Sequence, residues 1–206
     1  MMVSPMQKMS LRVRGLLDDR SGLAAVEFAM IFPMMVVMFF GVVELSSAIS
    51  ADRKATLVAR TLADLTSQMA SVADADLISF GQTAKAIMTP YPTSPLISSI
   101  TEVYIDSVSG AARAQWSKAL AIDTAGNVTI SSGPHGQGDV VVLPPALVVA
   151  KGTYVIWSKV SYKYTPAVGY MLAKTGLTFN DTAYTRPRTV LCVKYNGLPA
   201  NSCPTL

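Results

Sequence analysis

The residues best suited to chemistry stand where an apolar segment begins. Gly22 opens this segment, and Glu27 follows it as the first charged side chain. A cut between Gly22 and Leu23 would leave a new α-amino group one helical turn from Glu27, since residues four apart are neighbours on a helix. A carboxylate and an amine at this spacing can form an ion pair. The pattern therefore predicts processing and assembly in a membrane rather than catalysis.

The apolar segment is long enough to cross a membrane. From Leu23 to Val43 it has 21 residues, and Glu27 is its only charged one. At about 1.5 Å per residue a helix of this length reaches roughly 30 Å, the thickness of the hydrocarbon core. A secretory signal peptide has a shorter apolar region and a small-residue cleavage site after it, whereas helix-forming residues follow Val43. We therefore expect a retained anchor that bends at Pro33.

The two glutamates near this segment have different predicted surroundings. Glu44 follows its far end, where a carboxylate reaches headgroups or water, and we interpret it as a boundary residue. Glu27 lies about one turn inside, where an unpaired carboxylate costs a few kcal/mol. Two interpretations of Glu27 stay open. Either it is solvated at the cytoplasmic interface, or it pairs with an α-amine of this or a neighbouring chain and sets subunit register.

These residues also resemble a known family. The string GLAAVEFA at residues 22–29 is followed at fixed offsets by Pro33, Gly41, Glu44 and the pair Ala59-Arg60. This combination resembles the TadE/TadG-like proteins of bacterial tight-adherence, or Flp-type, pilus systems, and the similarity covers about residues 20–65. The shorter strings YKYTP at 162–166 and YTRPR at 184–188 also look like the ends of such proteins. The chain is short for a TadG-type protein, so the TadE type is favoured.

The resemblance implies a role, partners and a location. It implies a pseudopilin-like subunit with a pilin-like fold, cleaved in some members by a prepilin peptidase between the residues equivalent to Gly22 and Leu23. Glu27 and Phe28 fall in the part of the motif that would serve assembly. The implied partners are the membrane, other pilus-assembly subunits and pilins, and the peptidase, with homo- or hetero-oligomers forming through the N-terminal helix. The implied location is the bacterial inner membrane, with a pilus or the cell surface as a further location.

Flanking charges and cysteines address orientation. Four basic residues precede the segment and three follow it closely, which slightly favours a cytoplasmic N-terminus. Cys192 and Cys203 are the only cysteines, and the Gly/Pro/Asn-containing stretch between them could close a short loop. An even pair favours a disulfide in an oxidising space such as the periplasm, although two unrelated thiols remain an alternative. We therefore expect a single-pass protein with its C-terminal domain in the periplasm.

Hydrophobic spacing predicts helices in the first half of the chain. Val58, Leu62, Leu65 and Met69 recur at helical spacing beside a stripe of alanines, so one helix is expected from about residue 23 to 69. A second helix is expected over Asp74–Met88, ended by Thr89-Pro90, with residues 90–95 as a linker. Asp74 and Asp76 then suit the N-terminus of this helix.

Strand patterns dominate the second half. The expected strands are residues 97–108, 112–121, 153–164, 177–185 and 189–195, and residues 131–138 are expected to form a loop. The predicted fold is α+β, with a long N-terminal helix packed on an antiparallel sheet. The predicted organisation is a leader at 1–22, a transmembrane segment at 23–45, a helical stalk and second helix at 46–90, and a β-rich periplasmic domain at 91–206.

Other function classes find little support in the sequence. His135, the sole histidine, lies in a Gly/Pro-rich stretch, and no motif supplies a nucleophile or an orienting group for it. Two cysteines make half of a zinc site, so neither a metal nor a cofactor is expected. The net charge is +4, and the soluble part has no basic cluster with interleaved aromatics, so nucleic acid is not expected. The remaining alternative is a membrane-tethered periplasmic scaffold or binding module that never enters a filament.

Overall fold

The computed structural model describes residues 21–166 and 176–196. The chain divides into two compact units, Met1–Leu45 and Ser46–Leu206. Helix α2 (Ser21–Ser67) contributes to both, and its bounds confirm the long helix predicted from about residue 23 to 69. Cys203 and the leader residues 1–20 lie outside the described residues.

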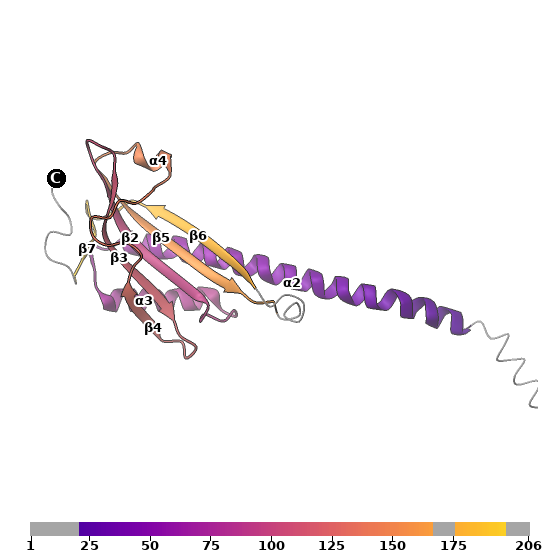
Figure 1. The fold of residues 1–206 in the computed structure, drawn as a ribbon. Helices are drawn as coiled ribbons and strands as arrows, with labels where there is room; N and C mark the ends of the chain where they lie inside the picture. The colour runs from indigo at the N-terminus through magenta and orange to yellow at the C-terminus, as the bar shows by residue number, and fades with distance from the viewer. Residues whose placement is uncertain (1–20, 167–175, 197–206) are drawn as a thin grey trace, which may run out of the picture. The chain divides into compact units, whose positions relative to one another are not determined.

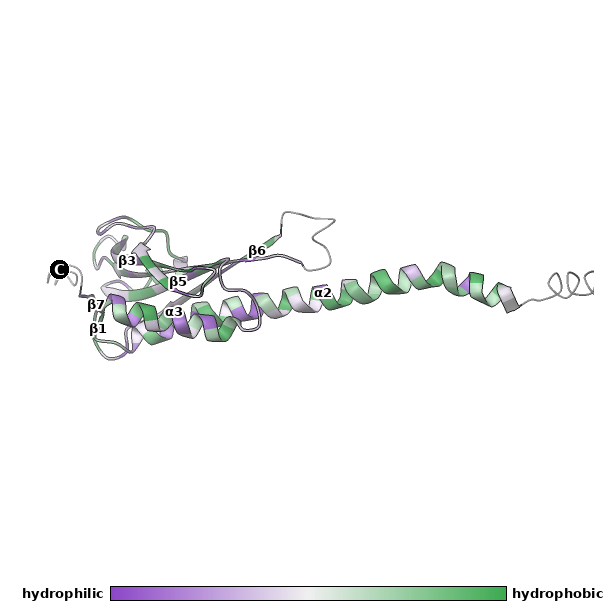
Figure 2. Ribbon diagram, turned by 90° about the horizontal axis from the view of Figure 1, so that it is seen from below, coloured by the Kyte–Doolittle hydropathy of each residue, from purple (hydrophilic) through white to green (hydrophobic). Residues whose placement is uncertain are grey.

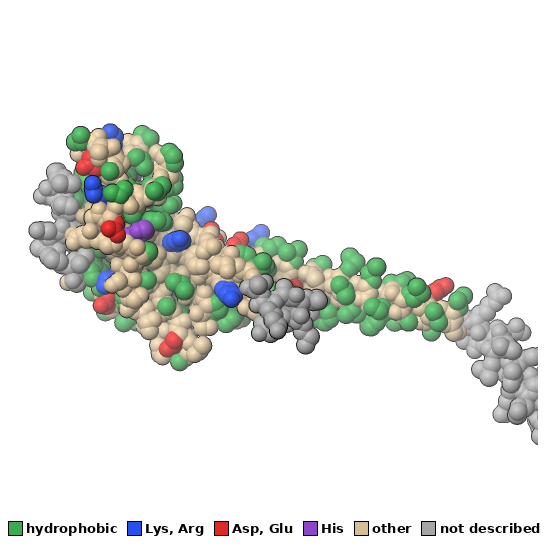
Figure 3. Space-filling model, in the orientation of Figure 1, with side chains coloured by type: hydrophobic (Ala, Val, Ile, Leu, Met, Phe, Trp, Pro, Cys, Tyr) green, Lys and Arg blue, Asp and Glu red, His purple; other side chains and the backbone are tan. Residues whose placement is uncertain are grey.

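The described part of the first unit is the apolar part of α2. The helix continues through Pro33, and the large apolar side chains of its residues 22–45 are mostly exposed. Figure 2 shows this part of α2 coloured mostly as hydrophobic, and Figure 3 shows apolar side chains along it. A helix that is apolar on all sides is typical of a membrane span. By length and composition α2 could cross a membrane, as predicted.

The second unit is a five-stranded antiparallel sheet with helices on one face. The sheet has the order β4-β3-β2-β5-β6, and α3 (Asp74–Met88) lies on the same face of it as α2 (Figure 1 and Figure 2). Its strands are β2 (Leu96–Ile105), β3 (Ala112–Ile122), β4 (Val128–Ser132), β5 (Thr153–Tyr164) and β6 (Leu177–Thr185). The short helix α4 (Pro145–Val148) lies in the connection between β4 and β5. The predicted α+β fold is confirmed.

Small residues allow α2 to pack closely on this unit. Ala51, Ala55 and Ala59 are almost completely buried, and Val58 and Leu62 beside them are in the same core. A stripe of alanines lets the helix backbone approach its neighbours, while the larger side chains fill the space on either side. The helical spacing seen in the sequence therefore predicts the buried face correctly.

Helix α3 is held at both ends. At its N-terminus the Asp76 carboxylate accepts a 2.9 Å hydrogen bond from the Ala73 N–H, which confirms the predicted role of the acidic first turn. At its C-terminus Lys54 of α2 donates to the carbonyls of Ile87 and Thr89 at 2.7 and 2.8 Å. These carbonyls lack helical partners, and a cation at this end also complements the helix dipole. Lys54 therefore joins the two helices.

The side chains of the sheet lie in two environments, one buried and one closer to the solvent. On β5, the side chains of Tyr154, Ile156, Val160 and Tyr162 are buried, and Leu96 of β2 pairs with Tyr162. Between β2 and β3 the register shifts after Glu102, which leaves Gln115 as an extra residue. Such a bulge bends the strand and re-aims the side chains beside it.

Three predicted elements have the predicted bounds, and two predictions are wrong. α3, β5 and β6 are correct to the residue, and the hairpin of β2 and β3 is confirmed with small differences at its ends. The loop predicted at 131–138 is wrong at its start, because Ser131 and Ser132 end strand β4, which pairs with β3. The strand predicted at 189–195 is reduced to β7 (Lys194–Tyr195), which pairs in parallel with β1 (Ser71–Val72) outside the main sheet.

We predict that Gly81→Ala destabilises the protein by about 1–2 kcal/mol, because overpacking outweighs the gain in helix propensity. A Cβ built on Gly81 of α3 would lie 2.5 Å from Cγ1 of Val128 on β4. Urea unfolding of the full chain in detergent would measure the effect, with the exposed Ser79→Ala on the same helix as a control. In a Val128→Ala background, Gly81→Ala should be neutral or stabilising. A stabilising Gly81→Ala in the parent chain would contradict the packing argument.

Candidate functional site

The residues predicted to serve processing and assembly lie together in the first turns of α2. Leu23, Glu27 and Phe28 are all exposed, and Leu23 and Glu27 are one helical turn apart. The Phe28 ring lies 5.4 Å from that of Phe32, one turn further along. No described atom lies within 4 Å of a Cβ built on Gly22. Packing within the described chain therefore gives no reason for a glycine at this position.

Glu44 differs from Glu27 in its surroundings. It is half-buried, whereas Glu27 is exposed. The two glutamates are separated by about 25 Å along the helix, at about 1.5 Å per residue, so they stand at opposite ends of the apolar part. The interpretation of Glu44 as a boundary residue stays a prediction.

A second carboxylate site, which the sequence did not indicate, is centred on Glu102. This residue of β2 is completely buried. Its Oε2 accepts a 3.0 Å hydrogen bond from Nε1 of Trp116, and its Oε1 accepts one of 2.7 Å from the backbone N–H of Val193. The sulfur of Cys192 lies 3.4 Å from Oε2. Glu102 therefore joins the central sheet to the C-terminal segment of the described chain.

Burial and hydrogen bonding act on Glu102 in opposite directions. Burial disfavours the charged form and raises the pKa of Glu102 to about 8, while the bonds from Val193 and Trp116 partly oppose this rise. Trp116 Nε1 also lies 2.8 Å from the carbonyl oxygen of Val193, so the indole contacts the segment directly. The sequence signal was weak: Glu102 has the same strand phase as Leu96 and Ile100, which are both buried.

The C-terminal segment is held at several further points. Val193 is completely buried, and Lys194 N–H donates to the Ala70 carbonyl at 3.3 Å beside the β1–β7 pairing. Cys192 is buried and disulfide-bonded. Because Cys203 lies outside the described residues, its pairing with Cys192 stays a prediction. A bridge closing a loop of about 10 residues would add roughly 2–3 kcal/mol in the chain-entropy model.

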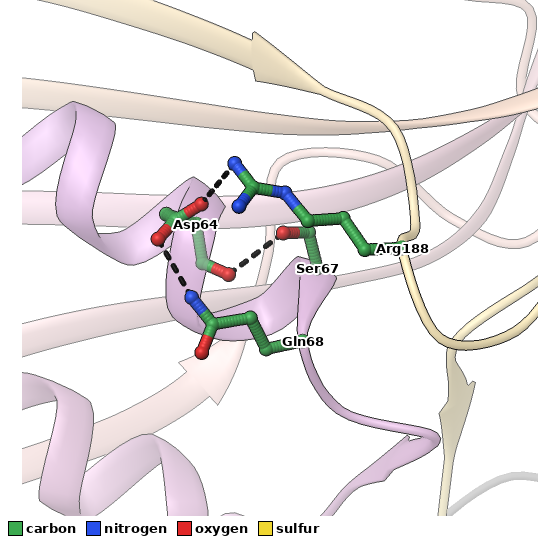
Figure 4. A network of polar contacts seen from close by, with 4 residues as sticks. All are labelled: Asp64, Ser67, Gln68 and Arg188. Carbon is green, nitrogen blue, oxygen red and sulfur yellow. Dashed lines mark hydrogen bonds and ion pairs between the residues drawn. The ribbon is translucent and has the colours of Figure 1, made fainter.

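The C-terminus of α2 is capped by a residue that follows β6. Figure 4 shows Asp64 between Arg188 and Gln68, with an Asp64–Arg188 ion pair of 2.6 Å and a 2.7 Å bond from Gln68 Nε2. The Arg188 N–H also donates to the Ser67 carbonyl at 2.9 Å. Arg188 thereby satisfies a carbonyl at the helix C-terminus and places a cation near the negative end of its dipole.

His135 is placed against aromatic rings. It stacks on Trp157 with ring centroids 5.4 Å apart, and Trp157 stacks on Tyr184 at 6.0 Å. Within residues 21–166 and 176–196, no group of three His, Cys, Asp or Glu side chains is arranged to hold a metal ion. The ring contacts give His135 a packing role on the sheet.

We predict that Glu102 makes stability depend on pH. Between about pH 4.5 and 8 the unfolded chain has released the Glu102 proton while the folded chain keeps it. This contribution is therefore complete below about pH 4.5, falls by about 1.4 kcal/mol per pH unit as pH rises, and levels off above about pH 8. Urea unfolding across this range should show a shallower fall for Glu102→Gln than for the parent chain. Equal slopes in the two chains would refute the assignment.

The comparisons with known proteins concern the first of these sites. Residues 22–64 match the family model described as TadE-like protein, which is about a fifth of the chain. No curated protein and no solved structure matches the chain significantly. The match begins at Gly22 and includes Leu23, Glu27, Phe28 and Glu44. The chain therefore carries a TadE-like domain at residues 22–64, which confirms the resemblance to the tight-adherence pilus-assembly family.

Proposed function

We propose that this protein is a membrane-anchored minor pilin or pseudopilin that contributes to assembly of a tight-adherence pilus. The observation that carries the proposal is the TadE-like match, which starts at Gly22 and covers the whole exposed apolar part of α2. Members of this family assemble pili, and an apolar helix with one internal glutamate suits lateral packing with other such helices. Other pilus subunits and pilins are thus the proposed partners.

Processing between Gly22 and Leu23 forms part of the proposal. The open space around Gly22 supports a role in recognition by a prepilin peptidase, since no contact within the described chain requires a glycine there. Cleavage would detach the leader and leave Leu23 with a free α-amino group. The shortened helix could then leave the bilayer for a filament, which a simple tether has no need to do.

The function proposed for Glu27 is charge pairing between subunits. At membrane depth an ionised carboxylate is costly unless it meets an opposite charge. A processed neighbour would present such a charge at its own Leu23 amine. Within the described residues no cation forms an ion pair with Glu27. This supports a partner from outside the chain, and with it a defined register between subunits.

The proposed topology follows from the cysteines as well as the anchor. A disulfide at Cys192 is typical of an oxidising compartment, which supports a periplasmic C-terminal domain and a cytoplasmic leader at the inner membrane.

We predict that the mature protein begins at Leu23. Mass spectrometry of the membrane-extracted protein, from cells with an active prepilin peptidase, should find Leu23 as the N-terminal residue. Gly22→Val should leave the leader attached, since the bulkier residue replaces the one before the cut. An intact Met1 or Met2 terminus on the parent chain under these conditions would exclude processing and favour a tethered scaffold.

We also predict that Glu27→Ala weakens assembly without preventing membrane insertion. Removing the carboxylate spares an insertion cost of a few kcal/mol, but it leaves the neighbour's ammonium unpaired, a loss that can reach several kcal/mol per contact. Crosslinking and co-purification with pilus subunits should therefore fall strongly. Glu44→Ala is the matched control and should have a smaller effect. Full partner association and full piliation with Glu27→Ala would show that Glu27 is a boundary residue.

A further inference from the structure

The two edges of the main sheet differ in length. One edge is β4, with five residues, and the other is β6, with nine. In the described part of the chain β6 pairs only with β5, so its other side offers backbone N–H and C=O groups to a further strand. Short edge strands resist such pairing, but β6 is long for an edge.

A groove runs beside the C-terminal end of this edge. It has a volume of about 420 Å³ and lies between α2 and β6, with Arg60 and Asp64 on one side and Tyr184 and Thr185 on the other. Arg188 also lines it. The groove would let side chains of an added strand lie next to α2, which would give the backbone pairing some side-chain specificity.

The charges of the groove favour an acidic occupant. Arg60 is exposed, and no acidic side chain among the described residues forms an ion pair with it. Arg188 pairs with Asp64, but its side chain is still 60% exposed. Asp64 is already engaged by Arg188 and Gln68. The groove therefore has an excess of positive charge, which an incoming carboxylate can complement.

A second copy of the chain fits this edge poorly. Asp181 is the middle residue of β6, so a symmetric antiparallel pairing of two β6 strands over their full length would set Asp181 opposite itself. Like charges directly opposite each other destabilise a strand pair. This argument favours a strand from a different protein over one from another copy.

We propose that β6 is a docking edge for an extended, acidic segment of a partner protein, which adds to the sheet as a sixth strand and places a carboxylate between Arg60 and Arg188. This interaction surface lies in the soluble unit and goes beyond the anchor-based function, since it neither needs nor excludes processing at Gly22. It gives the protein a second, independent means of binding a partner.

The test uses the nitrogen-labelled full chain in detergent micelles and synthetic peptides. The probe is a blocked peptide of about eight alternating valine and threonine residues with two glutamates at each end, which suits either strand direction. One control peptide carries lysines in place of the glutamates, and another has N-methylated backbone amides. NMR would follow peptide binding and the hydrogen exchange of β6 amides.

Binding of the glutamate peptide should slow exchange of β6 amides and exceed binding of both control peptides. Arg60→Glu should weaken this binding about fivefold or more, since it replaces an attraction by a repulsion. Arg53→Glu, an exposed arginine of α2 that does not line the groove, should leave it unchanged. Equal binding of the glutamate and lysine peptides, or shifts confined to residues away from β6, would overturn the proposal. Dimerisation of the full chain through β6 would also overturn it, by assigning the edge to a second copy.

Discussion

One helix, α2, has to suit two environments, and much of the structure follows from that constraint. Its residues 22–45 expose apolar side chains on nearly all sides, whereas Ala51, Ala55 and Ala59 form a narrow buried stripe further along. A helix surface that is apolar on all sides is stable only against lipid or other apolar helices. A helix with an apolar stripe on one side packs this stripe on a hydrophobic core and leaves its other side to the solvent. In this second part, Lys54 donates a hydrogen bond to α3, and Asp64 forms an ion pair with Arg188 from the segment after β6.

Local patterns predicted those elements whose burial is regular. β5 alternates buried and less buried residues from Ile156 to its end, and α3 places Leu77, Ala84 and Met88 at helical spacing on one buried face. In both cases the spacing of the apolar residues along the chain indicates which side of the element is buried. The bounds of these elements could therefore be predicted without knowing the rest of the fold.

The errors occur where contacts distant in sequence decide the conformation. Ser131 and Ser132 have turn-like chemistry, but they pair with Ala119 and Lys118 of β3, and this ladder outweighs their local preference. Residues 189–195 are rich in strand-forming Thr, Val and Tyr, yet Glu102 binds the Val193 N–H and the segment pairs with β1 instead of the main sheet. The Glu102 site itself was missed because its partners, Trp116 and Val193, are 14 and 91 residues away.

Glu27 and Glu102 have the same side chain in opposite surroundings. Glu102 is completely buried, and Trp116 and Val193 of the same chain donate hydrogen bonds to it. These bonds offset the free-energy cost of burying its carboxyl group, so Glu102 has a structural role. Glu27 is exposed on an apolar helix, and no described residue forms an ion pair with it. An unpaired carboxylate in such a setting lowers the stability of the isolated anchor. A compensating charge on another molecule, as in the proposed pairing between subunits, would offset this cost.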